Sequence, residues 1–419
     1  MSLHQAPEPG SDPDSPVHVV FVGAGAVGCF YASRLHHPSH NIYTSLIARS
    51  NYKALEANGV KLQTHTFGDY TFVPDAVFPS VAAAAVAQPR SSSSTGLDTA
   101  SSSLSPPSPL LGARDWDFVV VTTKALPDRS DDSELIAPLV GPQTCVVLIQ
   151  NGVGVEAPYR ARFPRTPIIS VVTVVSAEQT SPGIFRQNRW TRIHLGPYSN
   201  SASFSSSPSV AGGDGGDNTT AGLTPAGSPH PTASGAAAEA AAGDEDEHLQ
   251  KRGMACAQRL GDWWTRLGGI RDVELSDEIG LQTVRWHKLC INAAFNPSAV
   301  LSGGRGNADM ARDPELRAHL AGVMGEIWAA APRILGRHFP ADLAGPDKIL
   351  KSTERNVGSK PSMLLDWEAG RPLELEVILG NPVRIARGKG VDLLRMQTLY
   401  ALLRSAQRVR EERPREKKL

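Results

Sequence analysis

The chain has 419 residues, and its 42 Lys and Arg residues balance its 42 Asp and Glu residues, so the formal net charge is zero. This length favours two domains, while the balanced charge and the absence of a long apolar segment argue against nucleic-acid and membrane partners. The four cysteines lie far apart and form no C-x-x-C pair, so we expect no metal site and no disulfide framework, in a cytoplasmic protein with a small-molecule partner.

Polar, low-complexity tracts interrupt the chain at three places. Residues 1–16, 82–111 and 199–247 are rich in Ser, Ala, Gly and Pro and poor in the apolar residues that would offset the entropy of ordering. The first tract carries acids and prolines, unlike a signal peptide. We predict a disordered leader, a low-complexity insertion, a disordered insertion or linker, and a charged tail at 411–419.

Buried strands are predicted throughout the first half of the chain. Continuous apolar runs, rich in β-branched residues, lie at 17–23, 45–49, 116–124, 144–152 and 167–177. Such runs, separated by helical or loop segments, are typical of parallel strands that are covered on both faces. Residues 17–198 are therefore predicted to form an α/β domain with a Rossmann-type, doubly wound parallel sheet, to which 183–196 adds a hairpin or edge strands.

Helical periodicity replaces the strand pattern from about residue 248. It is found at 256–268, 277–296, 314–336 and 372–410, and this half has few strand signals. We predict an all-helical C-terminal domain over 248–410, with the domain boundary inside or just after the second long insertion.

A glycine-rich turn, GAGAVG, follows the first strand and precedes a helix-compatible segment. Its residues are Gly23, Ala24, Gly25, Ala26, Val27 and Gly28. Gly23 permits a tight turn, Gly25 lets a pyrophosphate approach the backbone, and Gly28 lets the helix pack closely on the strand. The helix N-terminus then offers free N–H groups to phosphates. We predict dinucleotide binding here, against the alternative of a turn that is merely rich in glycine.

The end of the second strand indicates which dinucleotide is bound. An NAD site usually has Asp or Glu about 20 residues beyond the glycine motif, where it accepts a hydrogen bond from the ribose 2′-OH. This chain has Arg49 there instead. A guanidinium group binds a 2′-phosphate, so NADPH and NADP⁺ are the preferred cofactors. The alternative is that Arg49 is an ordinary surface residue after a strand.

Two further strand ends carry polar residues. Lys124 follows the third strand, and Asn151 follows the fourth within the sequence QNGVG. Ligands of open α/β sheets bind beyond the carboxyl ends of the strands, so both residues are candidates for contact with a cofactor or substrate. For Lys124 a solvated loop lysine is the alternative, and for Asn151 it is an Asn-Gly turn without a ligand.

A polar stripe crosses the otherwise apolar helical segment WHKLCINAAFN. Lys288, Asn292 and Asn296 recur every fourth position, which places them on one side of a helix with a drift of about 40° each. Asn is a poor helix former, so a solvated stripe is the weaker interpretation. A lysine ammonium can donate the proton that a ketone oxygen needs during hydride reduction, which Arg cannot do, and the carboxamides can hold substrate oxygens.

Carboxylates follow in the segment SMLLDWEAGRPLELE. Ser362, Asp366, Glu374 and Glu376 are the candidates there. Glu374 would accept a hydrogen bond from a substrate hydroxyl or hold the ammonium group of Lys288. The alternative is that Glu374 and Glu376 are carboxylates in the first turn of a helix.

Together these motifs resemble the ketopantoate reductase family, the 2-dehydropantoate 2-reductases, within the 6-phosphogluconate-dehydrogenase-like superfamily. The match comprises GAGAVG at 23–28, the strand that ends in Arg49, TTKA at 122–125, QNGVG at 150–154, WHKLCINAAFNP at 286–297, and SMLLD followed by LELE at 362–376. Their order agrees over nearly all of the chain outside the insertions. The stripe with the downstream serine and glutamate is the most specific part.

The resemblance implies a catalytic role for Lys288, as general acid, and for Glu374. It implies that Asn292, Asn296, Asn307 and Ser362 join Lys288 in binding the substrate, and that Lys124, Asn151 and Ala177 lie near the cofactor. The implied reaction is the NADPH-dependent reduction of ketopantoate to (R)-pantoate, for pantothenate and coenzyme A biosynthesis, with the helical domain holding the substrate.

Two other functions stay open. The same groups would suit the reduction of another branched 2-oxo acid, because they recognise a carbonyl and a carboxylate more plainly than a particular side chain. The second alternative is a non-catalytic NADP(H)-binding sensor or interaction protein. A loss of catalysis is argued against by the joint retention of Lys288, Asn292, Asn296 and Glu374. The sequence does not decide between a monomer and a homodimer.

Overall fold

The structure is a computed structural model that describes residues 15–87, 116–199 and 233–412, with only the backbone described for 233–244. Residues 1–14, 88–115, 200–232 and 413–419 lie outside these ranges. The predicted leader, most of both predicted insertions and most of the predicted tail therefore fall outside the described residues.

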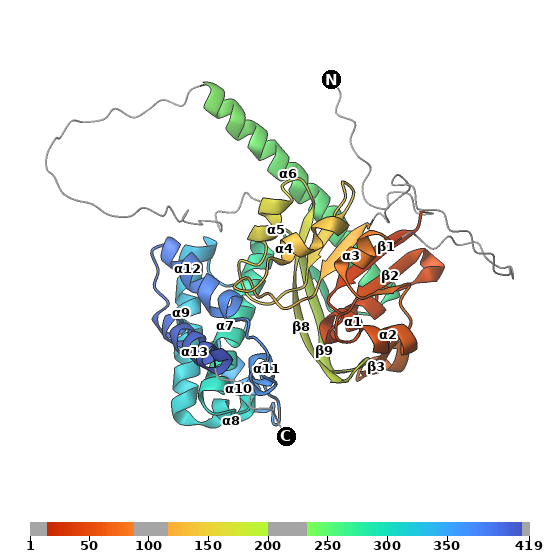
Figure 1. Ribbon diagram of the computed structural model, residues 1–419. Helices are drawn as coiled ribbons and strands as arrows, with labels where there is room; N and C mark the ends of the chain where they lie inside the picture. Colours follow the sequence, from red (N-terminus) through yellow and green to blue (C-terminus); the bar gives the residue numbers. More distant parts are fainter. Residues whose placement is uncertain (1–14, 88–115, 200–232, 413–419) are drawn as a thin grey trace, which may run out of the picture.

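One mixed sheet dominates the first half (Figure 1). Its strands follow the order β4-β3-β9-β8-β7-β6-β1-β2-β5, and β10 pairs with β9. All five predicted strands are present, as β1 (Val17–Val22), β2 (Ile42–Ile47), β6 (Phe118–Val121), β7 (Cys145–Leu148) and β8 (Ile168–Ser181). They pair in parallel, and their side chains are buried in two separate cores on the two faces of the sheet. The predicted doubly wound fold is confirmed.

Strand β9 (Ile184–Pro197) forms the predicted hairpin with β8, but it lies inside the sheet instead of at an edge. Four strands were not predicted: β3 (Val60–Thr64), β4 (Gly68–Phe72), β5 (Val77–Phe78) and β10 (Val273–Leu275). They are short, or they alternate buried and exposed residues, so they lack the continuous apolar run that identifies a central strand.

Short helices cover both faces of the sheet. They are α1 (Ala26–Ser33), α2 (Tyr52–Asn58), α3 (Val81–Ala85), α4 (Asp132–Ile136) and α5 (Ala157–Arg162), with 3-10 segments η1 (Pro38–His40) and η2 (Ala137–Leu139). Phe30 and Tyr31 of α1 belong to one core, whereas Ile136 and Tyr159 belong to the other. Loops follow the carboxyl ends of β1, β6 and β7.

The predicted domain boundary needs correction. Residues 233–247 were assigned to a disordered insertion, but α6 runs over Ala233–Asp262 and continues as the π-helical segment η3 (Trp263–Leu267). The Ala- and Glu-rich stretch has high helix propensity, which its low apolar content obscured. Cys256, Leu260 and Trp264 pack in the core that contains β1, so this segment covers the sheet and does not join the helical half. Likewise, α3 occupies the start of the predicted 82–111 insertion.

The second half is helical from residue 278 onward. Its elements are α7 (Glu278–Leu301), α8 (Asn307–Arg312), α9 (Pro314–Leu335), α10 (Pro346–Thr353), α11 (Ser362–Glu368), the π-helical η4 (Glu376–Gly380), α12 (Asn381–Gly388) and α13 (Leu394–Glu412). Helix α13 includes the first two residues of the predicted tail. Among the described residues, no helix is long and apolar enough to cross a bilayer.

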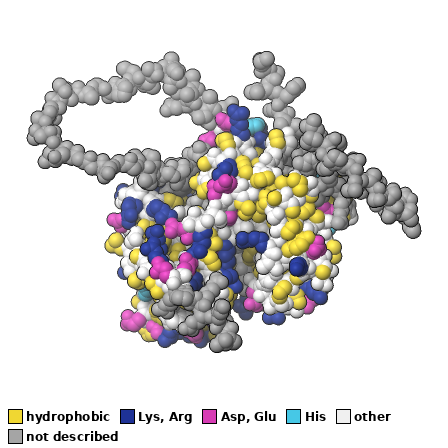
Figure 2. Space-filling model, in the orientation of Figure 1, with side chains coloured by type: hydrophobic (Ala, Val, Ile, Leu, Met, Phe, Trp, Pro, Cys, Tyr) yellow, Lys and Arg dark blue, Asp and Glu magenta, His cyan; other side chains and the backbone are white. Residues whose placement is uncertain are grey.

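Helix α7 connects the two halves. Asp277 begins it by accepting a hydrogen bond from the Gly280 N–H group, and its apolar side packs against α9 and α11. It also contacts β8 and β9 of the sheet. In the space-filling view a hollow separates the sheet half from the helical half, with Lys and Arg side chains on its rim (Figure 2).

Candidate active site

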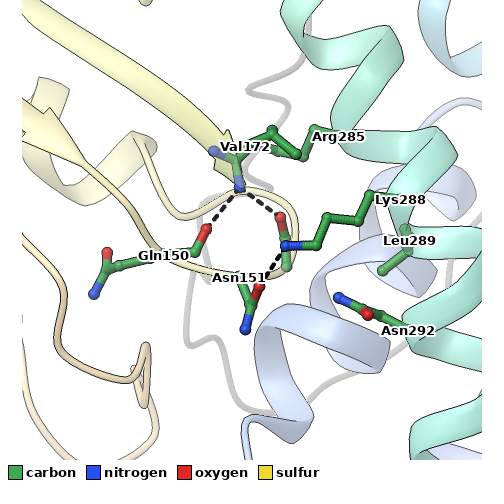
Figure 3. A pocket seen from close by; sticks show the side chains of 8 residues that line it. Gln150, Asn151, Val172, Arg285, Lys288, Leu289 and Asn292 are labelled. Atoms are coloured by element: carbon green, nitrogen blue, oxygen red, sulfur yellow. Dashed lines mark hydrogen bonds between the residues drawn. The ribbon is translucent and has the colours of Figure 1, made fainter. Parts of the chain in front are cut away.

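Lys288 lies where α7 faces the loop after β7. Its Nζ atom donates a hydrogen bond of 2.8 Å to Oδ1 of Asn151 (Figure 3). Both side chains line a small recess whose walls come from the loop after β7, from β8 and from α7. The lining residues are Gln150, Asn151, Gly152, Val172, Arg285, Lys288, Leu289 and Asn292. The structure therefore brings Lys288 and Asn292 of the stripe together with Asn151.

The surroundings of Lys288 favour proton transfer near neutral pH. The pKa of its ammonium group is lowered from the usual 10.5 to about 8, mainly by burial and also by the positive charge of Arg285, while Glu374 opposes both effects. An amine with this pKa is mostly protonated at neutral pH and still releases its proton readily.

Glu374 lies on the other side of Asn151. Its buried carboxylate accepts a hydrogen bond of 3.2 Å from the Ala125 N–H group and another from the Asn151 side chain. Burial raises the pKa of Glu374, whereas the positive charge of Lys124 lowers it. Asn151 thus links the amine of α7 to a carboxylate from the segment that precedes η4. Glu376 does not join them, because its carboxylate contacts Arg384 and Tyr400.

The Asn151 loop is fixed by close contact with the helical half. Gly152 has φ of +88°, and a Cβ atom there would lie 2.4 Å from the carbonyl oxygen of Val377. The Val153 N–H group donates to that same carbonyl at 2.8 Å. Glycine is therefore required at 152 for both its conformation and its small size, and the QNGVG motif holds Asn151 against η4.

Lys124 follows β6 and is not among the residues that line the recess. It is half-exposed and forms an ion pair with Asp366 of α11, which is buried and also contacts Arg371 at 2.8 Å. This pair joins the end of β6 to the helical half.

The glycine turn has the shape that a dinucleotide needs. Gly23 has φ of +111°, and a Cβ atom at Gly28 would lie 2.2 Å from the Gly23 carbonyl oxygen, so both positions need glycine. Gly25 precedes α1, and an added Cβ there would meet nothing within 4 Å. The turn is therefore tightly packed at Gly23 and Gly28 and has open space at Gly25. These residues fit a pyrophosphate at the N-terminus of α1.

Arg49 is exposed just beyond β2. Burial raises the pKa of Asp132 at the start of α4, and the charge of Arg49 partly opposes this effect. The neighbouring Asn51 is buried and donates to the Ala24 carbonyl at 3.1 Å, which ties the loop of Arg49 to the glycine turn. Ala177 lies on β8 opposite Gln187. It is five residues, or roughly 16 Å of strand, beyond Val172, and so apart from the Lys288 cluster.

The remaining candidate substrate residues form a second group, further along α7. Asn296 is buried, and its Oδ1 atom lies 3.5 Å from the N–H group of Met363, directly after the exposed Ser362. Asn307 begins α8, and its side chain donates to Ser359 at 3.2 Å. Neither Asn307 nor Ser362 lines the recess around Lys288.

Arg285 and Glu156 were missed by the sequence analysis. Both are almost fully buried, and they form an ion pair of 3.1 Å directly behind the Asn151 loop. Their positions follow no motif, and an arginine three residues before Lys288 has the spacing of an ordinary helix surface. The burial of the pair arises only when α7 packs on β8, so no sequence signal identified it.

A Rossmann-type sheet with an open glycine turn, together with a recess that holds a partly buried lysine, fits a nicotinamide-dinucleotide-dependent oxidoreductase. The comparisons with known proteins narrow this class. Residues 19–200 match the family model described as ketopantoate reductase PanE/ApbA, and residues 280–407 match the model of its C-terminal part. The chain belongs to the ketopantoate reductase family.

Individual relatives agree with this assignment. The chain is 34% identical to a 2-dehydropantoate 2-reductase of Caulobacter vibrioides over 69% of this chain and 77% of the relative. It is 28% identical to an uncharacterized protein of Saccharomyces cerevisiae over 94% and 95% of the two chains. The crystal structure of 2-dehydropantoate 2-reductase from Methylococcus capsulatus has a TM-score of 0.66 and 27% identity, covering 95% of this chain and 99% of that one.

Proposed function

We propose that this protein reduces 2-dehydropantoate to (R)-pantoate with NADPH, a step of pantothenate and coenzyme A biosynthesis, and that Lys288 is the general acid. The observation that carries the proposal is the partly buried Lys288 ammonium group, held by Asn151 in a recess between the two halves. Family membership supports the reaction class.

The residues around the recess have different roles in the reaction. A bound dinucleotide would supply hydride to the ketone carbon of the substrate. Lys288 donates one of its three N–H groups to Asn151, so two remain for the substrate oxygen, which is protonated as its negative charge grows. Asn292 lines the same recess and supplies an amide donor and an acceptor for the substrate's oxygens.

Glu374 supports Lys288 electrostatically. Its negative charge opposes the loss of a proton from the ammonium group, and its contact with Asn151 orients the carboxamide that accepts from Nζ. Further closure of the two halves around the substrate would exclude water and strengthen these interactions. Asn296 and Ser362 would then contact the distal part of the substrate.

Reduction is expected to fail at alkaline pH. Lys288 must be protonated to act, and its pKa is lowered to about 8. We therefore expect kcat/KM to be constant below this pH and to fall tenfold for each pH unit above it. Initial rates of NADPH oxidation between pH 6 and 10 measure this. A profile without a descending alkaline limb below pH 10 would contradict the role of Lys288.

The choice of NADPH over NADH is assigned to Arg49. Arg49→Ala is expected to raise the Kd for NADPH by about tenfold or more, the usual scale for the loss of a charge-assisted contact, while the Kd for NADH changes little. Titration of each dinucleotide by fluorescence measures both values. An equal rise in Kd for the two cofactors would contradict a 2′-phosphate site at Arg49. Arg186→Ala, on the exposed surface of β9, is the control and should change neither Kd.

The substrate is tested with a panel of 2-oxo acids and NADPH. Ketopantoate should have the highest kcat/KM, and other branched 2-oxo acids should be slower. A higher value for another branched 2-oxo acid would replace ketopantoate as the substrate while leaving the mechanism intact. Binding of NADPH without turnover of any member would favour a non-catalytic sensor.

A further inference from the structure

Arg285 contacts the Asn151 loop directly. It lies three residues before Lys288 on α7 and is almost fully buried. One terminal nitrogen, Nη1, donates to the carbonyl oxygens of Gln150 at 3.0 Å and Gly152 at 2.9 Å (Figure 3). These two carbonyls belong to the residues on either side of Asn151.

The rest of the guanidinium group is also held in place. Nη2 donates to Oγ of Ser170 at 2.6 Å and to the Val171 carbonyl at 3.2 Å, and Nε lies 3.1 Å from Oε1 of Glu156. The same Glu156 oxygen accepts from Ser170 at 2.6 Å and from Gln282 at 3.0 Å. Glu156 therefore neutralises the buried charge, and strand β8 fixes the orientation of the guanidinium plane.

We propose that Arg285, oriented by Glu156, is a positioning residue that holds Asn151 in the conformation that accepts from Lys288. The proposal rests on the proposed function in naming Lys288 as the proton donor. A planar guanidinium group reaches both flanking carbonyls at once, whereas a single ammonium group presents its donors from one point. With both neighbours clamped, the backbone of residue 151 has little freedom to rotate its side chain away from Nζ.

Arg285 also acts on Lys288 through its charge. It lies one helical turn away, on the same side as the recess, and its positive charge contributes to the lowered pKa of Lys288. The hydrogen bonds of Arg285 and its charge can be tested separately. Arg285→Lys retains the positive charge but loses the planar guanidinium group that reaches both carbonyl oxygens.

The test compares Arg285→Met with Arg285→Lys, using two readouts. The first is the pKa of Lys288, obtained from the rate at which acetic anhydride labels this residue at pH 6 to 10, with peptide mass spectrometry. The second is kcat for NADPH-dependent reduction, alongside the Kd of NADPH. Labelling does not depend on which substrate is turned over, so it still tests the proposal if ketopantoate is not the substrate.

Arg285→Met is expected to move the labelling curve of Lys288 to higher pH and to lower kcat at least tenfold, with the Kd of NADPH within threefold of the wild type. Arg285→Lys should leave the labelling curve in place while kcat still falls. A wild-type labelling curve and kcat in Arg285→Met would overturn the proposal. If that variant does not fold, Arg285→Lys decides alone, and a wild-type kcat in it would overturn the clamping role.

Arg160→Met is the matched control. Arg160 of α5 is also buried and donates to the backbone carbonyls of Phe163 and Thr166, but it contacts neither Asn151 nor Lys288. Its loss should lower thermal stability and leave the labelling curve of Lys288 unchanged. A similar shift of the curve in Arg160→Met would mean that loss of stability explains the Arg285 result, which would overturn the positioning role.

Discussion

Lys288→Ala is expected to lower kcat for 2-oxo acid reduction by about 10² or more, the scale of a lost general acid. The substitution removes the only ammonium group among the residues that line the described recess. The new oxyanion would then have to take its proton from water, at a higher activation free energy. The Kd for NADPH should change little, because the glycine turn and Arg49 lie on other elements. Stopped-flow and steady-state rates with saturating NADPH measure the effect.

Lys288→Arg is the control for charge. It keeps a cation near the substrate oxygen but cannot release a proton at neutral pH. It should therefore restore substrate binding without restoring kcat. If Lys288→Arg were as active as the wild type, the residue would act only by electrostatic attraction and the proton donor would have to be another group.

Gly25→Ala is expected to prevent dinucleotide binding without destabilising the fold. The backbone at Gly25 has φ of −88°, which alanine adopts readily, and the added Cβ atom would meet no protein atom within 4 Å. The methyl group would instead occupy the space through which a pyrophosphate reaches the turn. We expect the Kd of NADPH to rise at least about tenfold, or about 1.4 kcal/mol, with Tm unchanged. Calorimetric titration and a thermal melt measure the two quantities.

Gly28→Ala provides the contrast. Its Cβ atom would lie 2.2 Å from the Gly23 carbonyl oxygen and 2.5 Å from Oγ1 of Thr122, so the helix must move away from the strand. Overpacking of this kind costs about 1–3 kcal/mol, and Tm should fall by several degrees. If Gly25→Ala bound NADPH normally, the cofactor would not approach the turn there, and the assigned dinucleotide site would be wrong.

The sequence predicts the stripe on α7 well because helical geometry alone places residues four apart on one side. Lys288 and Asn292 indeed line one recess. Asn151 was predicted from its place after a buried strand, and its position next to Lys288 is a consequence of α7 packing across the carboxyl ends of the strands. Helical periodicity and the order of the strands therefore predict Lys288, Asn292 and Asn151 of the site.

Other features depend on tertiary contacts that a linear pattern does not contain. Arg285 has the composition of a surface residue, and only its burial behind the Asn151 loop makes it part of the site. The first half of α6, residues 233–247, was misassigned because its low apolar content was interpreted as disorder. Further along, Leu260 of α6 and Trp264 of η3 pack in the sheet core. The sequence also left open whether Glu374 and Glu376 act in the site or only at the start of a helix. The structure separates them, because Glu374 accepts from the Ala125 N–H group whereas Glu376 accepts from Tyr400.

The most direct test of the account is to mix the purified protein with NADPH and ketopantoate and follow absorbance at the nicotinamide band together with the product. The account predicts a loss of absorbance matched one-to-one by (R)-pantoate, which Lys288→Ala almost abolishes. Oxidation of NADPH at the same rate in Lys288→Ala, or no oxidation by wild-type protein that has bound NADPH, would contradict it.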